Sequence, residues 1–250
     1  YKTKRTEQNR LIYFFSTEVP LIVYHYRRYL VYAFVLFFAC TAIGVLSAKY
    51  DTDFVRLILG DYYVNMTLEN IENGNPVAVY KSGSNWGGFI AITMNNLYVG
   101  LRCFLYGIFL GIGTFWVMLQ NCIMLGSFQY FFYQQGVFWE SVQGIWIHGS
   151  MEIFAIVIES ACGFILGASI LFPRTFSRLN SFKIGFKDSL KIFLGTVPFT
   201  IAAGILEGFV TRYSLEMPNW LNVFIILSTL SLISFYFLIY PTIVHKKLNK

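Results

Sequence analysis

The chain has 250 residues, of which 56% are hydrophobic and only 13% are charged, and its formal net charge is +6. Soluble domains contain roughly 25% charged residues, so this composition excludes an ordinary soluble globular protein. Apolar runs of about 18 residues or more recur along the chain, and each is long enough to cross a bilayer as a helix. The sequence therefore predicts an all-α polytopic membrane protein.

Residues 1–28 are polar or mixed and lack the short apolar core of a signal peptide. We expect them to form a cytoplasmic approach segment, the end of an N-terminal cytoplasmic domain that precedes residue 1. The first span is predicted at 29–47, and the polar segment 49–88 follows it. Within that segment, residues 51–63 carry apolar side chains near helical spacing, which indicates a short amphipathic helix on the outer surface. Residues 69–88 are rich in Gly, Asn and Ser and predict turns.

Five further spans bring the predicted total to six. The apolar stretch 95–136 is long enough for two spans joined by a tight turn near 119–121, or for a re-entrant pair, and the sequence does not separate these alternatives. Single spans are predicted at 147–172, 192–210 and 221–240. The transmembrane domain thus covers 29–241, and residues 242–250 form a tail.

Charge predicts the orientation, because short cytoplasmic loops retain lysine and arginine. Basic residues exceed acidic ones in 1–29, in 173–191 and in the tail, whereas 49–88 holds more acidic than basic residues. Both termini are therefore expected in the cytoplasm, and 49–88 is expected outside.

Ionisable side chains inside spans are costly and usually face a protein interior or a cavity. His148 and Glu152 are four residues apart and share a helix face. Their span enters from outside, the span with Glu207 ends outside, and Asn95 and Asn96 begin another span. We therefore expect these five residues to form a polar cluster just under the outer surface.

A hydrogen-bonded tie between helices is the simplest interpretation of this cluster, with a proton or ion path, a metal site and catalysis as alternatives. The set contains one histidine, and the chain lacks an HExxH motif or a supported serine–histidine pair. We therefore assign no catalytic residue, metal ligand or cofactor, and expect no enzymatic activity.

Two further features concern helix contacts. Arg102 and Glu159 are expected at similar depth, so they are candidates for a buried ion pair, with an arginine that reaches the outer interface as the alternative. Small residues at GxxxG spacing let helices approach closely, within the chain or across a homodimer; they are Gly107, Gly111, Gly163 and Gly167.

Several segments together resemble the stage II sporulation protein M family. They are, in chain order, NN (95–96), GIFLGIGT (107–114), LQNCIMLG (119–126), IHGSME (147–152), ESACGFILGASILFP (159–173) and VPFTIAAGILEGFVTR (197–212). Glu159 departs from the family pattern, where a small residue is expected. The resemblance implies a multi-spanning protein of the bacterial inner membrane without known enzymatic activity.

The same resemblance implies partners. The namesake resembles a membrane anchor for peptidoglycan hydrolases, and members in other bacteria resemble parts of MoxR-type ATPase systems. We therefore expect an integral membrane scaffold of a cell-envelope complex that contacts membrane lipids and protein partners but no nucleic acid. A transporter or channel that uses the polar cluster is the first alternative, and a metal-dependent intramembrane enzyme is the second.

Overall fold

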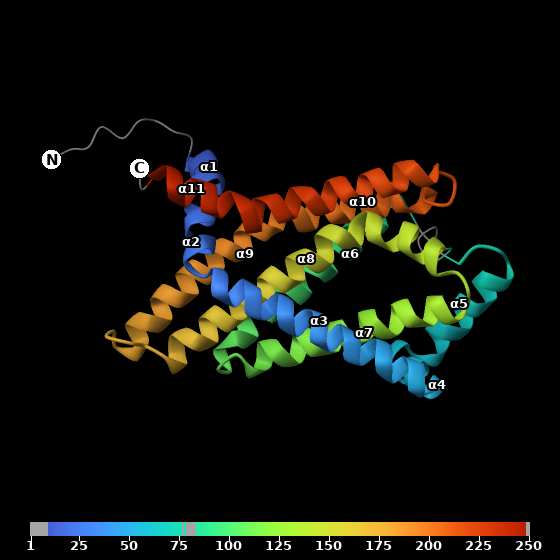
Figure 1. Cartoon of the computed structure of the whole chain (residues 1–250), viewed down its shortest axis with the longest axis horizontal. Coiled ribbons are helices and arrows are strands. Elements are labelled where there is room, and N and C mark those ends of the chain that lie inside the picture. Colours follow the sequence, from blue (N-terminus) through green and yellow to red (C-terminus); the bar gives the residue numbers. More distant parts are fainter. Residues whose placement is uncertain (1–9, 77, 79–83, 249–250) are drawn as a thin grey trace.

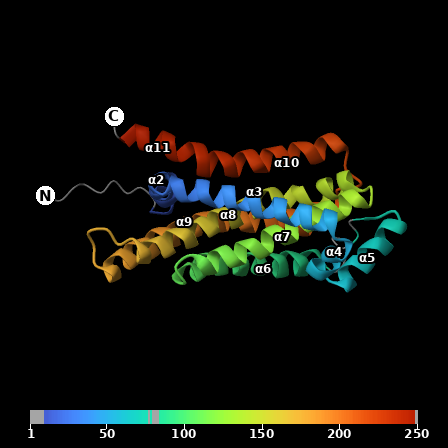
Figure 2. The same ribbon diagram turned by 60° about the horizontal axis from the view of Figure 1, so that its bottom comes forward.

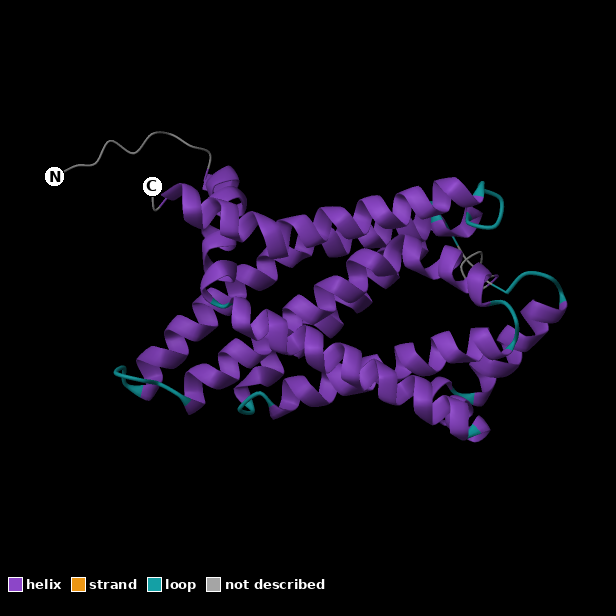
Figure 3. Cartoon of the chain, in the orientation of Figure 1, coloured by secondary structure: helices purple, strands orange, loops and turns teal. Residues whose placement is uncertain are grey.

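The computed structural model describes residues 10–76, 78 and 84–248, and every regular element in this part of the chain is helical (Figure 3). The predicted all-α fold is confirmed. The helices are α1 (Arg10–Tyr13), α2 (Val19–His25), α3 (Arg27–Tyr50), α4 (Thr52–Leu59), α5 (Asp61–Glu72), α6 (Asn85–Leu105), α7 (Ile112–Gln134), α8 (Phe138–Leu171), α9 (Arg178–Phe209), α10 (Asn219–Ser234) and α11 (Tyr240–Leu248).

Six long helical rods run along the molecule (Figure 1). Five of them are long and apolar enough to span a membrane: α3, α6, α8, α9 and the continuous rod that α10 and α11 form through a π-helical turn. The sixth rod is α7, which has 23 residues and contains the polar residues Gln120, Asn121 and Gln129. The protein is thus an all-α polytopic membrane protein in which α7 completes the six rods.

The ends of the rods gather in two groups (Figure 1). The α6–α7 turn, the α8–α9 loop, α1 and α11 lie at one end, which we call the terminal end. The α3–α4, α7–α8 and α9–α10 connections lie at the other end, together with α4 and α5. Successive connections therefore alternate between the two ends, as expected for a chain that passes along the bundle six times.

The α6–α7 turn differs in position from the prediction. Residues 119–121 lie inside α7, and the chain instead reverses at 106–111, where Leu110 and Gly111 have positive φ angles of 58° and 84°. Glycine adopts this left-handed conformation readily, and Gly111 begins α7. The sequence indicated a turn at the polar residues Gln120 and Asn121, but an amide inside a helix can bond its own backbone: Asn121 Nδ2 donates to Val117 O at 2.8 Å.

The two GxxxG motifs meet each other at this turn. A Cβ atom on Gly107 would lie 2.7 Å from the carbonyl carbon of Gly163, and one on Gly167 would lie 2.7 Å from that of Leu110. Gly107 and Gly111 were predicted to pack one helix on another, but they lie in the turn and at its exit, and they hold the turn against α8. Only hydrogen fits at Gly107 and Gly167, because a Cβ at either position would overlap backbone atoms, whereas Gly111 is required for its positive φ.

Helix α8 is the centre of the bundle. Its 34 residues include 21 buried ones, among them Ile147, Ile158 and Ile165. The rod of α10 and α11 lies on one side of it, and α6 and α7 lie on the opposite side (Figure 2). The main hydrophobic core surrounds the second half of α8 and includes Phe104 of α6, Ile192 of α9 and Ile233 of α10. Side chains carried by α8 therefore lie inside the protein.

The predicted amphipathic helix is present as two helices, α4 and α5, separated by Gly60 (φ 85°). Asp51 caps α4 by accepting a hydrogen bond from the Asp53 amide at 3.0 Å. Val55 and Val64 are buried against Phe131 and Phe132 of α7, while the acidic side chains remain exposed. Part of the expected turn region 69–88 is helical, since α5 continues to Glu72, and residues 77 and 79–83 lie outside the described residues.

The approach segment is helical from Arg10 onward and packs across the terminal end of the bundle (Figure 1). Val19 and Val23 are buried in the main core. Glu18 forms an ion pair with Lys191 of α9, and the Tyr236 hydroxyl donates to the carbonyl of Phe15 at 2.8 Å. The described part of this segment is therefore docked on α9 and on the α10–α11 rod.

Candidate functional site

A cavity of about 570 Å³ lies between α6, α7, α8 and α9, and residues of α3, α4 and α5 also line it. Most of its lining is apolar and includes Phe37, Ile58 and Met118. Six polar side chains converge on it: Asn95, Asn96, Asn121, His148, Glu152 and Glu207. Ligand sites typically combine such an apolar lining with a few convergent polar groups.

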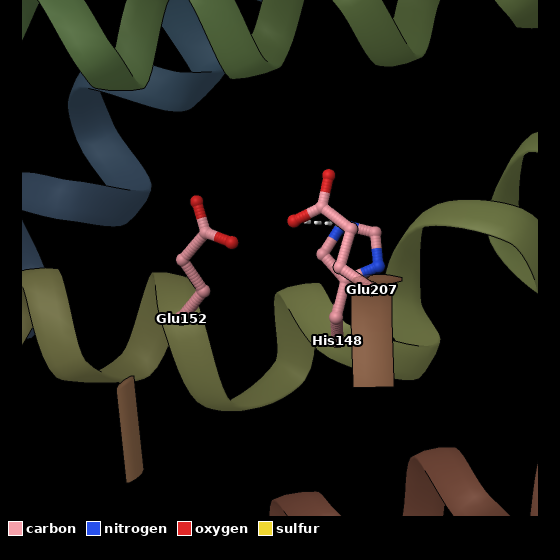
Figure 4. A group of neighbouring side chains, drawn as sticks. All are labelled: His148, Glu152 and Glu207. Atoms are coloured by element: carbon pink, nitrogen blue, oxygen red, sulfur yellow. Dashed lines mark ion pairs between the residues drawn. The ribbon is translucent and has the colours of Figure 1, made fainter. Parts of the chain in front are cut away.

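The local structure explains why three of these side chains meet. His148 and Glu152 occupy consecutive turns on one face of α8, and both side chains point toward the last turn of α9, where Glu207 lies (Figure 4). Gly208, next to Glu207, packs α9 against the start of α6, because a Cβ there would lie 3.0 Å from Asn85 O. The absence of a side chain at Gly208 thus lets α9 approach α6 closely at the level of Glu207.

The three side chains have the spacing of metal ligands. His148 Nε2 lies 3.6 Å from Glu207 Oε2, and one candidate ligand atom from each of His148, Glu152 and Glu207 lies within 4.8 Å of the others. The side chains of His148 and Glu207 are only 5% and 11% exposed. Such a buried His–Glu–Glu set is an environment in which a cation would offset unfavourable negative charge.

A second contact orients the histidine. His148 Nδ1 lies 2.9 Å from the hydroxyl of Thr211, which is fully buried just after α9. If Nδ1 carries the ring hydrogen, Thr211 accepts it, and Nε2 presents its lone pair toward Glu207. Metal-binding histidines usually have such a partner for the second ring nitrogen, because it fixes the tautomer and the ring orientation.

The asparagine pair of α6 forms the opposite wall. Asn95 Nδ2 donates to Asn96 Oδ1 at 3.3 Å. Asn96 is 6% exposed. Its side chain lies next to the Glu152 carboxylate, but its Nδ2 atom makes no well-formed hydrogen bond within the described part of the chain. Burying an amide N–H without a partner costs about 1–3 kcal/mol. A bound water or ligand in the cavity would supply that partner.

The predicted cluster residues therefore line one cavity, but at a different depth from that expected. Helix α6 begins at Asn85 and α8 at Phe138, each about three turns earlier than predicted. At about 1.5 Å per residue, Asn95 and His148 lie about 15 Å, and Glu152 about 21 Å, from the first residues of their helices. They lie well inside the bundle, and only Glu207 lies near a helix end.

The predicted ion pair between Arg102 and Glu159 is wrong. Glu159 accepts a hydrogen bond from Thr196 Oγ1 at 2.7 Å, and its carboxylate lies against Gly100. Arg102 is two residues from Gly100, so it points about 200° away around α6. Its guanidinium instead lies over the rings of Tyr98 and Tyr106, at 5.8 and 5.5 Å from their centroids.

Two features of the site were missed from the sequence. Thr211 has a recognisable signal, because it follows Glu207 by four residues, about one helical turn. The metal-ligand spacing has no such signal in the sequence, because His148 and Glu207 are far apart in the chain and no sequence motif joins them. The expectation of no metal ligands was based on the single histidine in the set, although a metal site stood among the alternatives.

The fold and the cavity define the class: this is a polytopic α-helical membrane protein with a polar cavity among its spans. Residues 33–212, well over half of the chain, match the family described as "Stage II sporulation protein M". The chain belongs to that family, and the predicted resemblance is confirmed. The matched range contains every polar residue of the cavity. No curated protein and no solved structure matches the chain.

Proposed function

We propose that this protein binds a divalent transition-metal ion inside the membrane, with His148, Glu152 and Glu207 as ligands. The observation that carries the proposal is that one ligand atom from each side chain lies within 4.8 Å of the others. Imidazole nitrogen and carboxylate oxygen suit zinc, manganese and iron, which bind such atoms at about 2.0–2.2 Å. Small side-chain rotations would bring the three atoms onto one ion.

The surroundings support this assignment. The Thr211 hydroxyl orients His148, and the Asn96 amide, which lacks a well-formed hydrogen bond, lies in the wall of the same cavity. Three protein ligands leave coordination positions open toward the cavity, where water or a further ligand can bind. The proposal assigns no enzymatic reaction to the chain.

Metal analysis of the purified protein tests this proposal. The wild-type protein in lipid nanodiscs is expected to bind about one equivalent of zinc or manganese, and Glu152→Gln and Glu207→Gln are each expected to lose it. Glu159→Gln is the matched control, because this glutamate is also buried in α8 but its oxygen accepts from Thr196. Binding that survives Glu152→Gln and Glu207→Gln together would contradict the assignment.

A flux assay distinguishes a resident ion from a transported one. Proteoliposomes with a trapped metal indicator should show no uptake if the ion stays in the site. Uptake that Glu152→Gln abolishes and Glu159→Gln preserves would instead support the transporter alternative. Both variants must retain the folded protein, as shown by a single symmetric gel-filtration peak.

A second candidate function is that of a membrane anchor in a bacterial cell-envelope complex. The observation that favours it is the surface of α4 and α5, where Asp51, Asp53, Asp61, Glu69 and Glu72 are all exposed while the apolar side is fixed on α7. In this proposal the chain lies in the inner membrane, both termini face the cytoplasm, and α4–α5 faces outward. Of the partners that the family resemblance implies, a peptidoglycan hydrolase fits this outward surface, whereas an ATPase system would contact the cytoplasmic side.

Site-specific photo-crosslinking tests the anchor. A crosslinker at Leu57, which is 78% exposed on α4, should capture one envelope protein in stoichiometric amount. A crosslinker at Leu232, which is 56% exposed on α10, is the control for contacts in the membrane. Capture of the same proteins from both positions, or of none from Leu57, would contradict a docking role for α4–α5.

A further inference from the structure

A second cavity, of about 600 Å³, lies at the terminal end of the bundle, away from the polar cluster. It lies between the α2–α3 junction, the last turns of α8, the α8–α9 loop and the start of α9 (Figure 1). Its floor is rigid: the Ser181 hydroxyl donates to Ser169 O at 2.7 Å, and a Cβ on Gly185 would lie 2.5 Å from Ser169 Oγ. Helices α8 and α9 therefore cannot close further to fill it.

Positive charge surrounds the polar side of this cavity. Arg27, Arg28 and Arg174 line it, together with His25, and none of its described lining residues is acidic. None of the three arginines forms an ion pair with a carboxylate of the described residues. The nearby Asp188 lies outside the lining and accepts a hydrogen bond from the Tyr26 hydroxyl at 3.0 Å.

Local structure restrains two of the arginines, Arg27 and Arg174. Arg27 Nη1 donates to Tyr24 O at 3.1 Å, and its guanidinium lies 4.4 Å from the centre of the Tyr24 ring. Arg174 lies in a turn that Phe176 N closes on Pro173 O at 3.1 Å, and its φ is +55°. A non-glycine residue in this left-handed conformation is strained. Arg174 and Tyr26 both line the cavity.

Apolar side chains of α8 and α9 line another part of the cavity. Ile165 and Ala168 of α8 and Ile184 of α9 line it, and the neighbouring Phe172 and Phe176 are 70% and 55% exposed. A guanidinium cluster next to an apolar wall matches a ligand with an anionic head and a hydrocarbon part. Arginine pairs with phosphate through two parallel hydrogen bonds, which makes it the preferred residue for this recognition.

We propose that this cavity is a binding site for the phosphate headgroup of an anionic phospholipid, with Arg28 and Arg174 as the phosphate ligands, Arg27 beside them, and the Ile165–Ala168 wall in contact with an acyl chain. Basic pockets between transmembrane helices on the cytoplasmic side commonly bind such headgroups. The charge pattern predicts that this end of the bundle faces the cytoplasm, where anionic lipids are concentrated. The site is independent of the metal proposal, since it shares no residue with the polar cluster.

Native mass spectrometry of the full chain, released from nanodiscs that contain phosphatidylglycerol and phosphatidylcholine in equal amounts, tests the proposal. We expect one tightly retained phosphatidylglycerol. Arg28→Gln combined with Arg174→Gln should weaken its binding about 30-fold, because each basic side chain near an anionic lipid contributes about fivefold. Arg178→Gln combined with Lys187→Gln is the control, since it removes the same charge from exposed positions of α9 outside the cavity.

Ala168→Phe provides a second variant that keeps every charge but fills the apolar wall, and it should also displace the lipid. Equal loss in the cavity and control variants would overturn the proposal in favour of a diffuse surface charge effect. Retention of the lipid by both cavity variants would also overturn it. Titration with inorganic phosphate separates the sources: saturation of the site by phosphate as tightly as by the lipid would assign it to a soluble phosphate compound instead.

Discussion

Replacing Gly163 by alanine should destabilise the contact between α8 and the α6–α7 turn. A Cβ atom at this position would lie 2.8 Å from Thr114 Cγ2 and closer still to Thr114 Oγ1 and the carbonyl oxygen of Cys103. These two groups are joined by a hydrogen bond of 2.7 Å from Thr114 Oγ1 to Cys103 O, and both are buried. The added methyl group must therefore move the turn away from α8.

The magnitude follows from three contributions. Overpacking a tight core position costs about 1–3 kcal/mol, and loss of the Thr114 hydrogen bond costs about 1 kcal/mol more. Alanine is favoured over glycine within a helix by about 1 kcal/mol, which offsets part of this. The net loss is about 1–3 kcal/mol, or a fall in Tm of roughly 2–12 °C for a chain of this size.

Thermal unfolding in detergent, followed by tryptophan fluorescence, measures this change. Gly149→Ala is the control on the same helix, because its Cβ would meet only Ile153 Cδ1 at 3.5 Å and Ile145 Cγ2 at 3.6 Å, which are ordinary contacts. This control should leave Tm unchanged or raise it slightly. If Gly163→Ala is as stable as Gly149→Ala, the turn is not held by glycine contacts, and the reasoning is wrong.

Three further changes have expected outcomes. Thr211→Val should weaken metal binding about 10–100-fold in isothermal titration without unfolding the protein, because it removes the partner of His148 Nδ1. Arg102→Gln should cost less than about 1 kcal/mol in the same unfolding assay, as expected for a cation–π contact; a loss of about 3–5 kcal/mol would indicate a buried ion pair with Glu159 after all. Tyr26→Phe should change the alkaline pH dependence: burial and an adjacent aspartate raise the pKa of the Tyr26 phenol, so its stabilisation is present below about pH 10 and is lost above it. Melting curves from pH 8 to pH 12 should fall less steeply for the variant, and identical slopes would contradict this role.

The sequence was sufficient for the class of fold and for five of the polar residues that line the cavity, but not for Asn121, which was predicted to lie in a turn. Long apolar runs fix the helices, and the cost of burying His148, Glu152 and Glu207 requires that they share an interior. The sequence was insufficient for predicting how far the polar residues lie from the ends of their helices. Trp86 and Trp139 lie in stretches that resemble loops in sequence but form the first turns of α6 and α8. Aromatic residues of this kind are common at helix ends near the membrane surface.

The wrong prediction of an ion pair between Arg102 and Glu159 has a different cause. Arg102 and Glu159 were paired because the two charges were expected at similar depth and each would offset the other's burial. The direction of a side chain around its helix depends on which neighbour the helix faces, and Gly100 turned out to face α8. Thr196 supplies the hydrogen bond that Glu159 needs, so a neutral partner replaces the expected charge.

The glycine contacts also explain why a cavity exists beside α8 at all. Helix α7 packs tightly on α3, where a Cβ on Gly44 would lie 2.5 Å from Ile123 O and one on Gly126 would lie 2.9 Å from Val45 N. The turn that precedes α7 is held against α8 at Gly163 and Gly167, near the terminal end. Because α7 follows α3 beyond this point, its side chains do not fill the space beside His148 and Glu152. Two sets of glycine contacts, neither of which includes a residue of the polar cluster, therefore leave room for a ligand at that cluster.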